Sequence, residues 1–242
     1  MISIVSSRNP RLKSLRALHG KRARERTGSF AAEGEDLIAA AQRAGRPALE
    51  GYRLAGSGLG GERFADVEPA ALAAVSTLGS GTRVIGVYEQ RWSEPSGPLC
   101  IYLHGVADPG NVGTVLRAAE AFGAACVALG PGCADPHAPK AVRASMGAIF
   151  AVALARVADV RELPGELIAL VAHQGSPLPG LGVALADAPA LSLLIGAERQ
   201  GLPEEVLAAC DRVVQIPIAS DSINAAMAAC VALYELSRVP AS

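Results

Sequence analysis

Residues 99–129 read LCIYLHGVADPGNVGTVLRAAEAFGAACVAL and have the pattern of a strand, a helix and a second strand. Leu99–Leu103 and Ala125–Leu129 are apolar runs of strand length. Between them, residues 111–122 repeat apolar side chains at helical spacing, and Gly123 follows where a helix would end. This order predicts two parallel strands joined by a crossover helix.

The same alternation continues to the C-terminus. Further strands are predicted at residues 151–155, 167–172, 191–195 and 213–216, and helices at 139–144, 203–209 and 222–237. Such a chain predicts a mainly parallel sheet covered on both faces, with ligands bound at the carboxyl ends of its strands. The last helix is apolar nearly all round, which indicates burial in a core or a subunit interface.

The residues before this sheet predict a second, smaller α/β unit. We expect helices at 9–19, 35–44 and 68–78, and strands at 30–34, 52–55 and 83–88. Residues 91–98, RWSEPSGP, contain two prolines, a glycine and two serines, which is typical of a linker. The predicted domains are therefore residues 1–95 and residues 96–242.

Charge is distributed unevenly along the chain. The formal net charge is −1, but residues 1–98 contain 14 Lys/Arg and 10 Asp/Glu, whereas residues 99–242 contain 8 and 13. The first 26 residues hold eight basic side chains and one acid, Glu25. A basic N-terminal segment favours a nucleic-acid partner, although a solvated helix face would have the same pattern. The candidate RNA-binding residues are Arg8, Arg11, Lys13, Arg16, Lys21, Arg22 and Arg24.

Composition excludes several classes of protein. Half of the residues are hydrophobic and 19% are charged, which excludes wholesale disorder. No apolar run reaches the roughly 18–20 residues of a membrane span, and the N-terminus lacks a signal-peptide core. The five cysteines form no CxxC pair, so we expect free thiols and no structural metal site. A cytoplasmic protein without membrane or metal is therefore expected.

Three polar segments follow predicted strands. In the first, Asp108–Arg117, a Pro-Gly turn precedes Asn111, which could cap the next helix. Asn111, Thr114 and Arg117 are three residues apart, so they share a helix side away from the apolar stripe. The pattern fits either a polar site or a simple cap with a surface arginine.

The second and third segments end two later strands. In Leu194–Leu202, Gly196 permits a close approach of a ligand to the backbone, and Glu198 lies just beyond the strand. In the third, Ile216-Pro217 ends a strand, Ser222 lies where a helix cap is expected, and Asn224 lies in the first turn. None of the segments matches a phosphate-binding loop, a zinc signature, a nucleophile elbow or a dinucleotide fingerprint.

Together these segments resemble the three motifs of the SpoU, or TrmH-type, RNA ribose 2′-O-methyltransferases of the SPOUT superfamily. The N-terminal residues also resemble the RNA-binding domain of that family, which is akin to a ribosomal protein fold. The matching positions are Asp108, Pro109, Asn111, Gly113, Arg117, Ala118, Phe122 and Gly123; Gly196, Glu198, Gly201 and Leu202; Ile216, Pro217, Ser222 and Asn224; and, in the N-terminal domain, residues 7–10, Leu12, Lys13, Arg24, Phe30, Glu33 and Gly34.

Three positions depart from the pattern of the family. His104 stands where an aspartate is common, Ile223 replaces a leucine, and Ala225 stands where valine is frequent. None of these changes removes a polar residue of the motifs. The resemblance therefore still implies an active enzyme.

The resemblance implies a C-terminal parallel sheet with a deep trefoil knot, and a homodimer formed through the knotted domain and the C-terminal helix. S-adenosylmethionine would bind within the knot, at Gly196, Ile216 and Ile223, and no metal would be needed. Asn111, Glu198, Ser222 and Asn224 would orient the target nucleotide and Arg117. That arginine would position the ribose hydroxyl, or act as its general base, although a guanidinium stays protonated at neutral pH.

Three alternatives remain open at this point. The chain could be a non-catalytic RNA-binding protein that retains the fold, it could methylate a base nitrogen, or it could act on tRNA. The polar motif residues argue for an enzyme that modifies ribose. The resemblance favours ribosomal RNA over tRNA, because members of the family that act on tRNA often lack the N-terminal domain. The sequence does not distinguish a role in ribosome maturation from one in antibiotic resistance.

Overall fold

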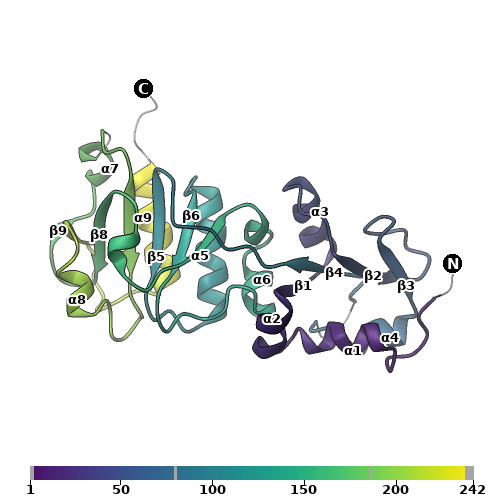
Figure 1. The fold of residues 1–242 in the computed structure, drawn as a ribbon. Helices are drawn as coiled ribbons and strands as arrows, with labels where there is room; N and C mark the ends of the chain where they lie inside the picture. The colour runs from purple at the N-terminus through teal and green to yellow at the C-terminus, as the bar shows by residue number, and fades with distance from the viewer. Residues whose placement is uncertain (1–2, 79–80, 186, 238–242) are drawn as a thin grey trace. The chain divides into compact units, whose positions relative to one another are not determined.

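The computed structural model describes residues 3–78, 81–185 and 187–237, and it divides into two compact units (Figure 1). Unit 1 contains the described residues of 1–90 together with those of 135–151. Unit 2 contains the described residues of 91–134 and 152–242.

Unit 1 is built on a four-stranded mixed sheet in the order β1-β4-β2-β3. Strand β4 runs antiparallel to β1 and β2, and β3 runs parallel to β2. Its elements are α1 (Pro10–Ala17), α2 (Lys21–Thr27), β1 (Ser29–Glu33), α3 (Glu35–Arg43), β2 (Glu50–Leu54), β3 (Phe64–Val67), α4 (Pro69–Ala73) and β4 (Val84–Glu89). The structure thus adds α2 and β3 to the predicted elements, and its α4 is shorter than predicted.

Helix α1 covers one face of this sheet, and α3 packs on β1 and β4. Leu12 and Leu15 of α1 pack with Tyr52 and Ile85, which are buried. Since successive strand residues point to opposite faces, Gly51 and Gly86 belong to the other face.

Residues 135–151 come from the second half of the chain but fold with unit 1. They form α6 (Pro139–Ala144) and the short 3₁₀ helix η1 (Ala148–Phe150). The Phe150 ring lies 4.7 Å from that of Tyr88 and 5.8 Å from that of Phe30, measured between centroids. The sequence predicted that this segment belongs to the second domain. The prediction was wrong because the residues that the segment packs against are distant in the chain.

Unit 2 is a seven-stranded sheet in the order β7-β6-β5-β10-β8-β11-β9, and all its pairings are parallel. The predicted α/β fold with a parallel sheet is therefore confirmed. Its strands are β5 (Leu99–Leu103), β6 (Cys126–Leu129), β7 (Ala153–Arg156), β8 (Glu166–Val171), β9 (Ser176–Pro177), β10 (Leu191–Ile195) and β11 (Arg212–Gln215). Its helices are α5 (Pro109–Ala121), η2 (Val160–Glu162), α7 (Leu181–Ala184), α8 (Glu204–Leu207) and α9 (Ala225–Ser237).

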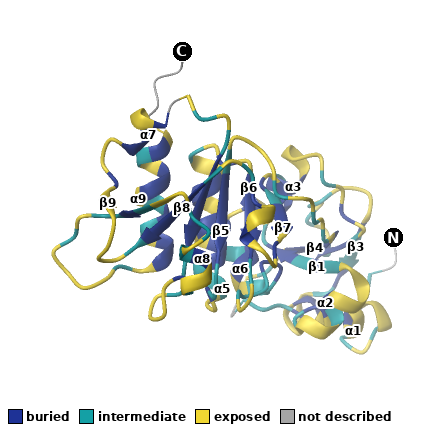
Figure 2. Ribbon diagram, turned by 60° about the vertical axis from the view of Figure 1, so that its left-hand side comes forward, coloured by how far each residue is buried: buried dark blue, intermediate teal, exposed yellow. Residues whose placement is uncertain are grey.

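Both faces of the central strands are covered, and Figure 2 shows these strands as mainly buried. Helices α5 and α9 pack against each other. A separate core cluster includes Tyr102 and Leu194 from the sheet together with Leu202 and Val206 around α8. The carboxyl ends of β5, β8, β10 and β11 therefore meet at one edge of the sheet, where the three polar segments begin.

The caps of two helices differ from the prediction. Asp108, not Asn111, caps α5, since its carboxylate accepts a hydrogen bond from the backbone N–H of Asn111 at 3.0 Å. Helix α9 begins at Ala225, and the side chain of Asn224, not that of Ser222, accepts hydrogen bonds from its first turn. Asp, Asn and Ser side chains near a helix start can all act as N-caps. The sequence therefore did not distinguish Asp108 from Asn111, or Ser222 from Asn224.

No described helix is long and apolar enough to cross a membrane. All five cysteines are free thiols. Within the described ranges, no three His, Cys, Asp or Glu side chains are grouped as a metal site would require.

Candidate active site

A cavity of about 260 Å³ lies at the carboxyl edge of the parallel sheet of unit 2. The ends of β8 and β10 contribute apolar walls, including Leu170 and Ile195. The segments after β10 and β11 complete it, and they include all three predicted cofactor residues, Gly196, Ile216 and Ile223.

Close packing of the backbone after β10 requires a glycine at position 196. A Cβ atom at this position would lie 2.1 Å from the carbonyl carbon of Gly201 and 2.5 Å from the nitrogen of Leu202. The segment after β10 folds back here, as the bridge between Ala197 and Gly201 also shows. The sequence argument attributed this glycine to a ligand approaching the backbone. The structure gives a different reason, although Gly196 does line the cavity.

A polar network connects the three sequence segments beside this cavity. The side-chain amide of Asn111 donates a hydrogen bond to the Glu198 carboxylate. The amide of Asn224 donates to the Asn111 carbonyl oxygen at 3.1 Å. The Asn224 oxygen accepts from the backbone N–H groups of Ala226 and Met227 at 2.9 and 3.2 Å. In each side-chain amide the NH₂ group donates and the oxygen accepts a hydrogen bond. The network therefore fixes the orientation of both asparagines.

Two predicted catalytic residues lie outside this network. Ser222 is exposed and lines the cavity, and its backbone carbonyl accepts a hydrogen bond from Ser220. Arg117 is exposed on α5, and it makes no hydrogen bond or ion pair with the residues that the structure describes. The structure therefore brings together Asn111, Glu198 and Asn224, and leaves Arg117 free to bind another group.

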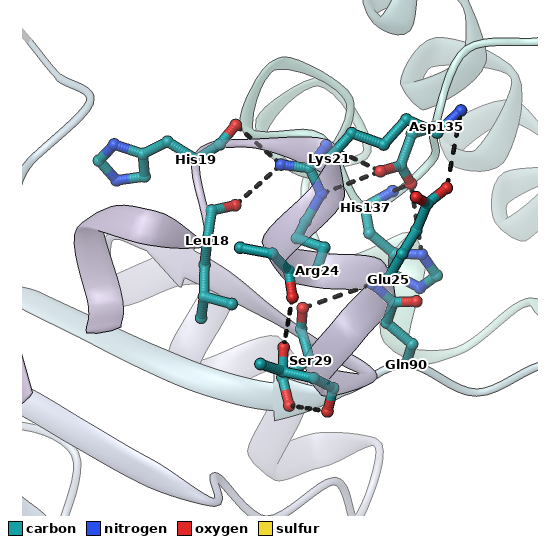
Figure 3. A network of polar contacts seen from close by, with 11 residues as sticks. Leu18, His19, Lys21, Arg24, Glu25, Ser29, Gln90, Asp135 and His137 are labelled. Carbon is teal, nitrogen blue, oxygen red and sulfur yellow. Dashed lines mark hydrogen bonds and ion pairs between the residues drawn. The ribbon is translucent and has the colours of Figure 1, made fainter. Parts of the chain in front are cut away.

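Arg24 is not part of an exposed basic surface. Its side chain is 4% exposed, and its guanidinium donates to the carbonyls of Leu18 and His19, both at 2.8 Å (Figure 3). It also pairs with Asp135, at 2.8 Å from Nη2 and 2.9 Å from Nε. Sequence placed Arg24 among the RNA-binding residues. The structure corrects this, because a buried guanidinium that is held by Asp135 and two backbone carbonyls does not reach a phosphate.

His137 and Arg24 together determine the charge state of Asp135. Burial alone would raise the pKa of its carboxyl group. Hydrogen bonds from His137 and Arg24, and the positive charge of Arg24, outweigh that effect and hold the pKa well below its usual range.

The other six candidate RNA-binding residues are exposed. Arg11 pairs with Glu50 at 3.4 Å, Arg16 donates to a backbone carbonyl at 2.7 Å, and Lys21 lies 3.8 Å from Glu25. Such exposed contacts contribute little and can exchange for phosphates. Arg8, Lys13 and Arg22 form no ion pair with the described residues.

The two units differ in charge more than the two sequence halves do. The sequence ranges of unit 1 contain 15 Lys/Arg and 10 Asp/Glu, a net charge of +5. Those of unit 2 contain 7 and 13, a net charge of −6. The assignment of segment 135–151 to unit 1 therefore sharpens the asymmetry that suggested a polyanionic partner.

Two family models match the chain. The model described as the SpoU rRNA Methylase family matches residues 98–234, and the model described as the MRM3-like substrate binding domain matches residues 9–90. The first match covers more than half of the chain and includes all three polar segments. The second lies within unit 1.

Individual proteins agree with these matches. An AdoMet-bound rRNA methyltransferase from Sinorhizobium meliloti has a TM-score of 0.86 and 30% identity, covering 100% of this chain and 99% of that one. The 23S rRNA (guanosine(2553)-2′-O)-methyltransferase of Bacillus subtilis is 27% identical over 253 residues, which cover 98% of this chain and 99% of the relative. An uncharacterized tRNA/rRNA methyltransferase of Mycobacterium bovis is 37% identical over 145 residues, which cover 56% of this chain and only 50% of that protein.

Proposed function

Because the chain belongs to the SpoU rRNA methylase family, we propose that it methylates the 2′-hydroxyl of a ribose in ribosomal RNA. The family is one of RNA methyltransferases, and S-adenosylmethionine is the methyl donor. The observation that carries the finer proposal is the network of Asn111, Glu198 and Asn224 beside the cavity. The named activity of the Bacillus subtilis relative on a 2′-oxygen of 23S rRNA supports the same acceptor.

The cavity has the chemistry that an adenosine needs. Its apolar walls, such as Leu170, Ile195 and Ile223, suit a purine ring, and its volume of about 260 Å³ is near the lower end for small-molecule sites. Residues 196–201 border it, together with Ile216, Ile218, Ser222 and Ile223, and their backbone groups can recognise the polar edges of a base and a ribose. Gly196, Ile216 and Ile223 would hold S-adenosylmethionine there.

The bound sulfonium supplies a methyl group that is already activated for transfer. The residues of the chain must then orient the acceptor hydroxyl and receive or stabilise its proton. Glu198 is exposed and accepts one hydrogen bond from Asn111, so its carboxylate retains acceptor sites for a ribose hydroxyl. Asn224 and Asn111 hold that carboxylate in one orientation, and Ser222 can contact the nucleotide from the cavity wall.

Arg117 takes a separate role in this proposal. An arginine side chain stays protonated at neutral pH, so it binds and positions an anionic or hydroxyl oxygen more readily than it removes a proton. Its exposure on α5, outside the network, leaves all of its donors available for the RNA. We assign it to positioning the target ribose or the adjacent phosphate.

The surface of α9 supports the predicted homodimer. Met227, Val231 and Tyr234 are 61%, 43% and 53% exposed, and their spacing places them along one side of the helix. An exposed apolar stripe on an otherwise buried helix favours a protein partner. In this proposal the partner is a second copy of the chain, and the C-terminal parallel-sheet domain contains the trefoil knot of the SPOUT superfamily.

Transfer of labelled methyl groups tests the proposal. Purified protein is mixed with S-[methyl-³H]adenosylmethionine and with ribosomal RNA from cells that lack the gene, and the RNA is digested to nucleosides. We expect label in 2′-O-methylnucleosides, greatly reduced transfer by Asn111→Ala and Glu198→Gln, and normal transfer by Glu120→Gln, an exposed carboxylate on α5. Label on a base nitrogen, or no label in the ribosomal RNA, would contradict it.

A further inference from the structure

Two charged side chains of opposite sign, Glu198 and Arg199, line the cavity of about 260 Å³ in unit 2. They are adjacent in the turn after β10, and the other described residues that line this cavity are neutral. The proposed function uses the Glu198 carboxylate for the acceptor hydroxyl. It gives no role to the Arg199 guanidinium, although that group borders the space assigned to the methyl donor.

The turn that carries Arg199 has a fixed backbone. Ala197 and Gly201 form a bridge in which the N–H of Gly201 donates to the carbonyl of Ala197 at 2.9 Å. Gly201 has a φ of +67°, a left-handed conformation that glycine adopts without strain. The backbone of Gly201 also packs so closely on Gly196 that a Cβ atom there would collide with it. The turn therefore presents the Arg199 side chain to the cavity from a rigid position.

The guanidinium of Arg199 is available to a ligand. The side chain belongs to an exposed residue and makes no hydrogen bond or ion pair with the residues that the structure describes. Two other exposed arginines of unit 2 are paired, Arg161 with Asp159 at 3.2 Å and Arg212 with Glu166. Since a guanidinium has five N–H donors, a ligand that enters the cavity meets a full set of unused donors.

S-adenosylmethionine carries one anionic group, the α-carboxylate of its methionine part. A carboxylate in a mainly apolar cavity requires a charged or hydrogen-bonding partner, because burial of an unpaired charge is costly. The net charge of −6 on unit 2 makes a local cation more important for an anion. The planar guanidinium of arginine matches a carboxylate with two parallel hydrogen bonds.

The first turn of α9 does not offer a competing anion site. Helix N-termini can bind anions through their free N–H groups. Here the side-chain oxygen of Asn224 accepts from the N–H groups of Ala226 and Met227, at 2.9 and 3.2 Å. The backbone carbonyl of Asn224 accepts from the N–H of Ala228 at 2.9 Å. These three donors are occupied, so Arg199 is the charged donor at the described wall of the cavity.

We infer that Arg199 binds the α-carboxylate of S-adenosylmethionine and makes the cavity selective for the intact methionine part of the donor. The two charged residues of one turn then serve the two reactants, Glu198 the acceptor hydroxyl and Arg199 the donor. Arg199 is a donor-specificity residue in this assignment and takes no part in proton transfer. The inference rests on the proposed function in one respect, namely that the donor occupies this cavity.

A pair of ligands that differ only in the carboxylate tests the inference. Dissociation constants of the full-length chain are measured by calorimetry for S-adenosylmethionine and for decarboxylated S-adenosylmethionine. We expect the unmutated protein to bind the first about tenfold more tightly, as one charge-assisted contact implies. Arg199→Ala should weaken S-adenosylmethionine about tenfold and leave the decarboxylated ligand unchanged, so that the preference disappears. Arg199→Lys should keep part of the preference, because it retains the charge and loses the planar fork.

Two controls separate this effect from misfolding and from RNA binding. Arg161→Ala removes an exposed arginine of the same unit that does not line the cavity, so it should keep the tenfold preference. Arg199→Ala should leave the circular dichroism spectrum and the affinity for ribosomal RNA in filter binding unchanged. Weaker RNA binding with an unchanged donor preference would assign Arg199 to a phosphate of the RNA and overturn the inference.

The outcomes distinguish this inference from the proposed function. A tenfold preference that persists in Arg199→Ala, or equal affinity of the unmutated protein for both ligands, would overturn the inference even if the protein methylates ribose. Ile223→Trp fills the cavity and should abolish the binding of both ligands. Undiminished binding by Ile223→Trp would refute the cavity as the donor site, and the inference with it. A preference that Arg199→Ala abolishes would support the inference even if no ribose were methylated.

Discussion

Replacement of Arg24 by methionine tests the largest correction that the structure makes to the sequence interpretation. The variant removes four interactions of the guanidinium, two with Asp135 and two with the carbonyls of Leu18 and His19. Removal of one partner from a buried ion pair costs about 3–5 kcal/mol. We expect about 3 kcal/mol, at the lower end, since Asp135 keeps a hydrogen bond from the His137 backbone N–H at 2.9 Å.

Urea unfolding, followed by circular dichroism, measures this loss in the free energy of unfolding. Arg22→Met is the matched control, because Arg22 is an exposed arginine of the same helix and should change stability by less than about 0.5 kcal/mol. The double variant Arg24→Met with Asp135→Leu should recover part of the loss, since it leaves no unpaired buried charge. A loss below about 1 kcal/mol for Arg24→Met would refute the structural role.

The same pair predicts how stability depends on pH. The folded pKa of Asp135 is lowered, so its contribution is fully present above the unfolded value of about 3.9. It is lost as the pH falls from about 5 toward the folded pKa. Arg24→Met should therefore flatten the acid side of the stability profile. An unchanged profile would mean that Arg24 does not hold the Asp135 carboxylate ionised.

Four further outcomes follow from the structure. Arg117→Ala should leave the fold and the affinity for S-adenosylhomocysteine intact and reduce single-turnover methyl transfer by orders of magnitude, with little rescue by Arg117→Lys; near-normal transfer would remove Arg117 from the mechanism. Gly196→Ala should abolish S-adenosylhomocysteine binding in calorimetry, because its Cβ would collide with the Gly201 backbone; undiminished affinity would contradict the fold-back after β10. Lys13→Ala should lower the slope of log affinity for RNA against log salt by about one, and an unchanged slope would show that Lys13 is merely solvated. Tyr234→Glu should shift the protein toward monomer in analytical ultracentrifugation, and an unaltered dimer would exclude the α9 stripe as its interface.

The convergence of the three polar segments was predictable from the sequence. Carboxyl ends of parallel strands meet at one edge, so Asn111 and Glu198 were expected near each other. The details of the network were not predictable. Either Asp108 or Asn111 could cap α5, and the cap that formed left the Asn111 side chain free to bond Glu198 and Asn224.

The density of basic residues in the sequence did not predict which arginines are exposed and which are buried. Arg22 and Arg24 belong to the same basic helix, yet one is exposed and the other buried. The difference depends on Asp135, which lies 111 residues away in sequence. Local patterns predict elements, whereas pairing between distant segments determines which side chains remain available.

Mapping of ribose methylation in cells tests the central claim most directly. Ribosomal RNA and tRNA are isolated from cells with the gene, without it, and with the Asn111→Ala variant, and 2′-O-methylated positions are located by mass spectrometry. The account predicts at least one 2′-O-methylated position in ribosomal RNA that is present with the intact gene and absent in the other two strains. Identical methylation in all three strains, or a difference confined to methylated bases, would contradict it.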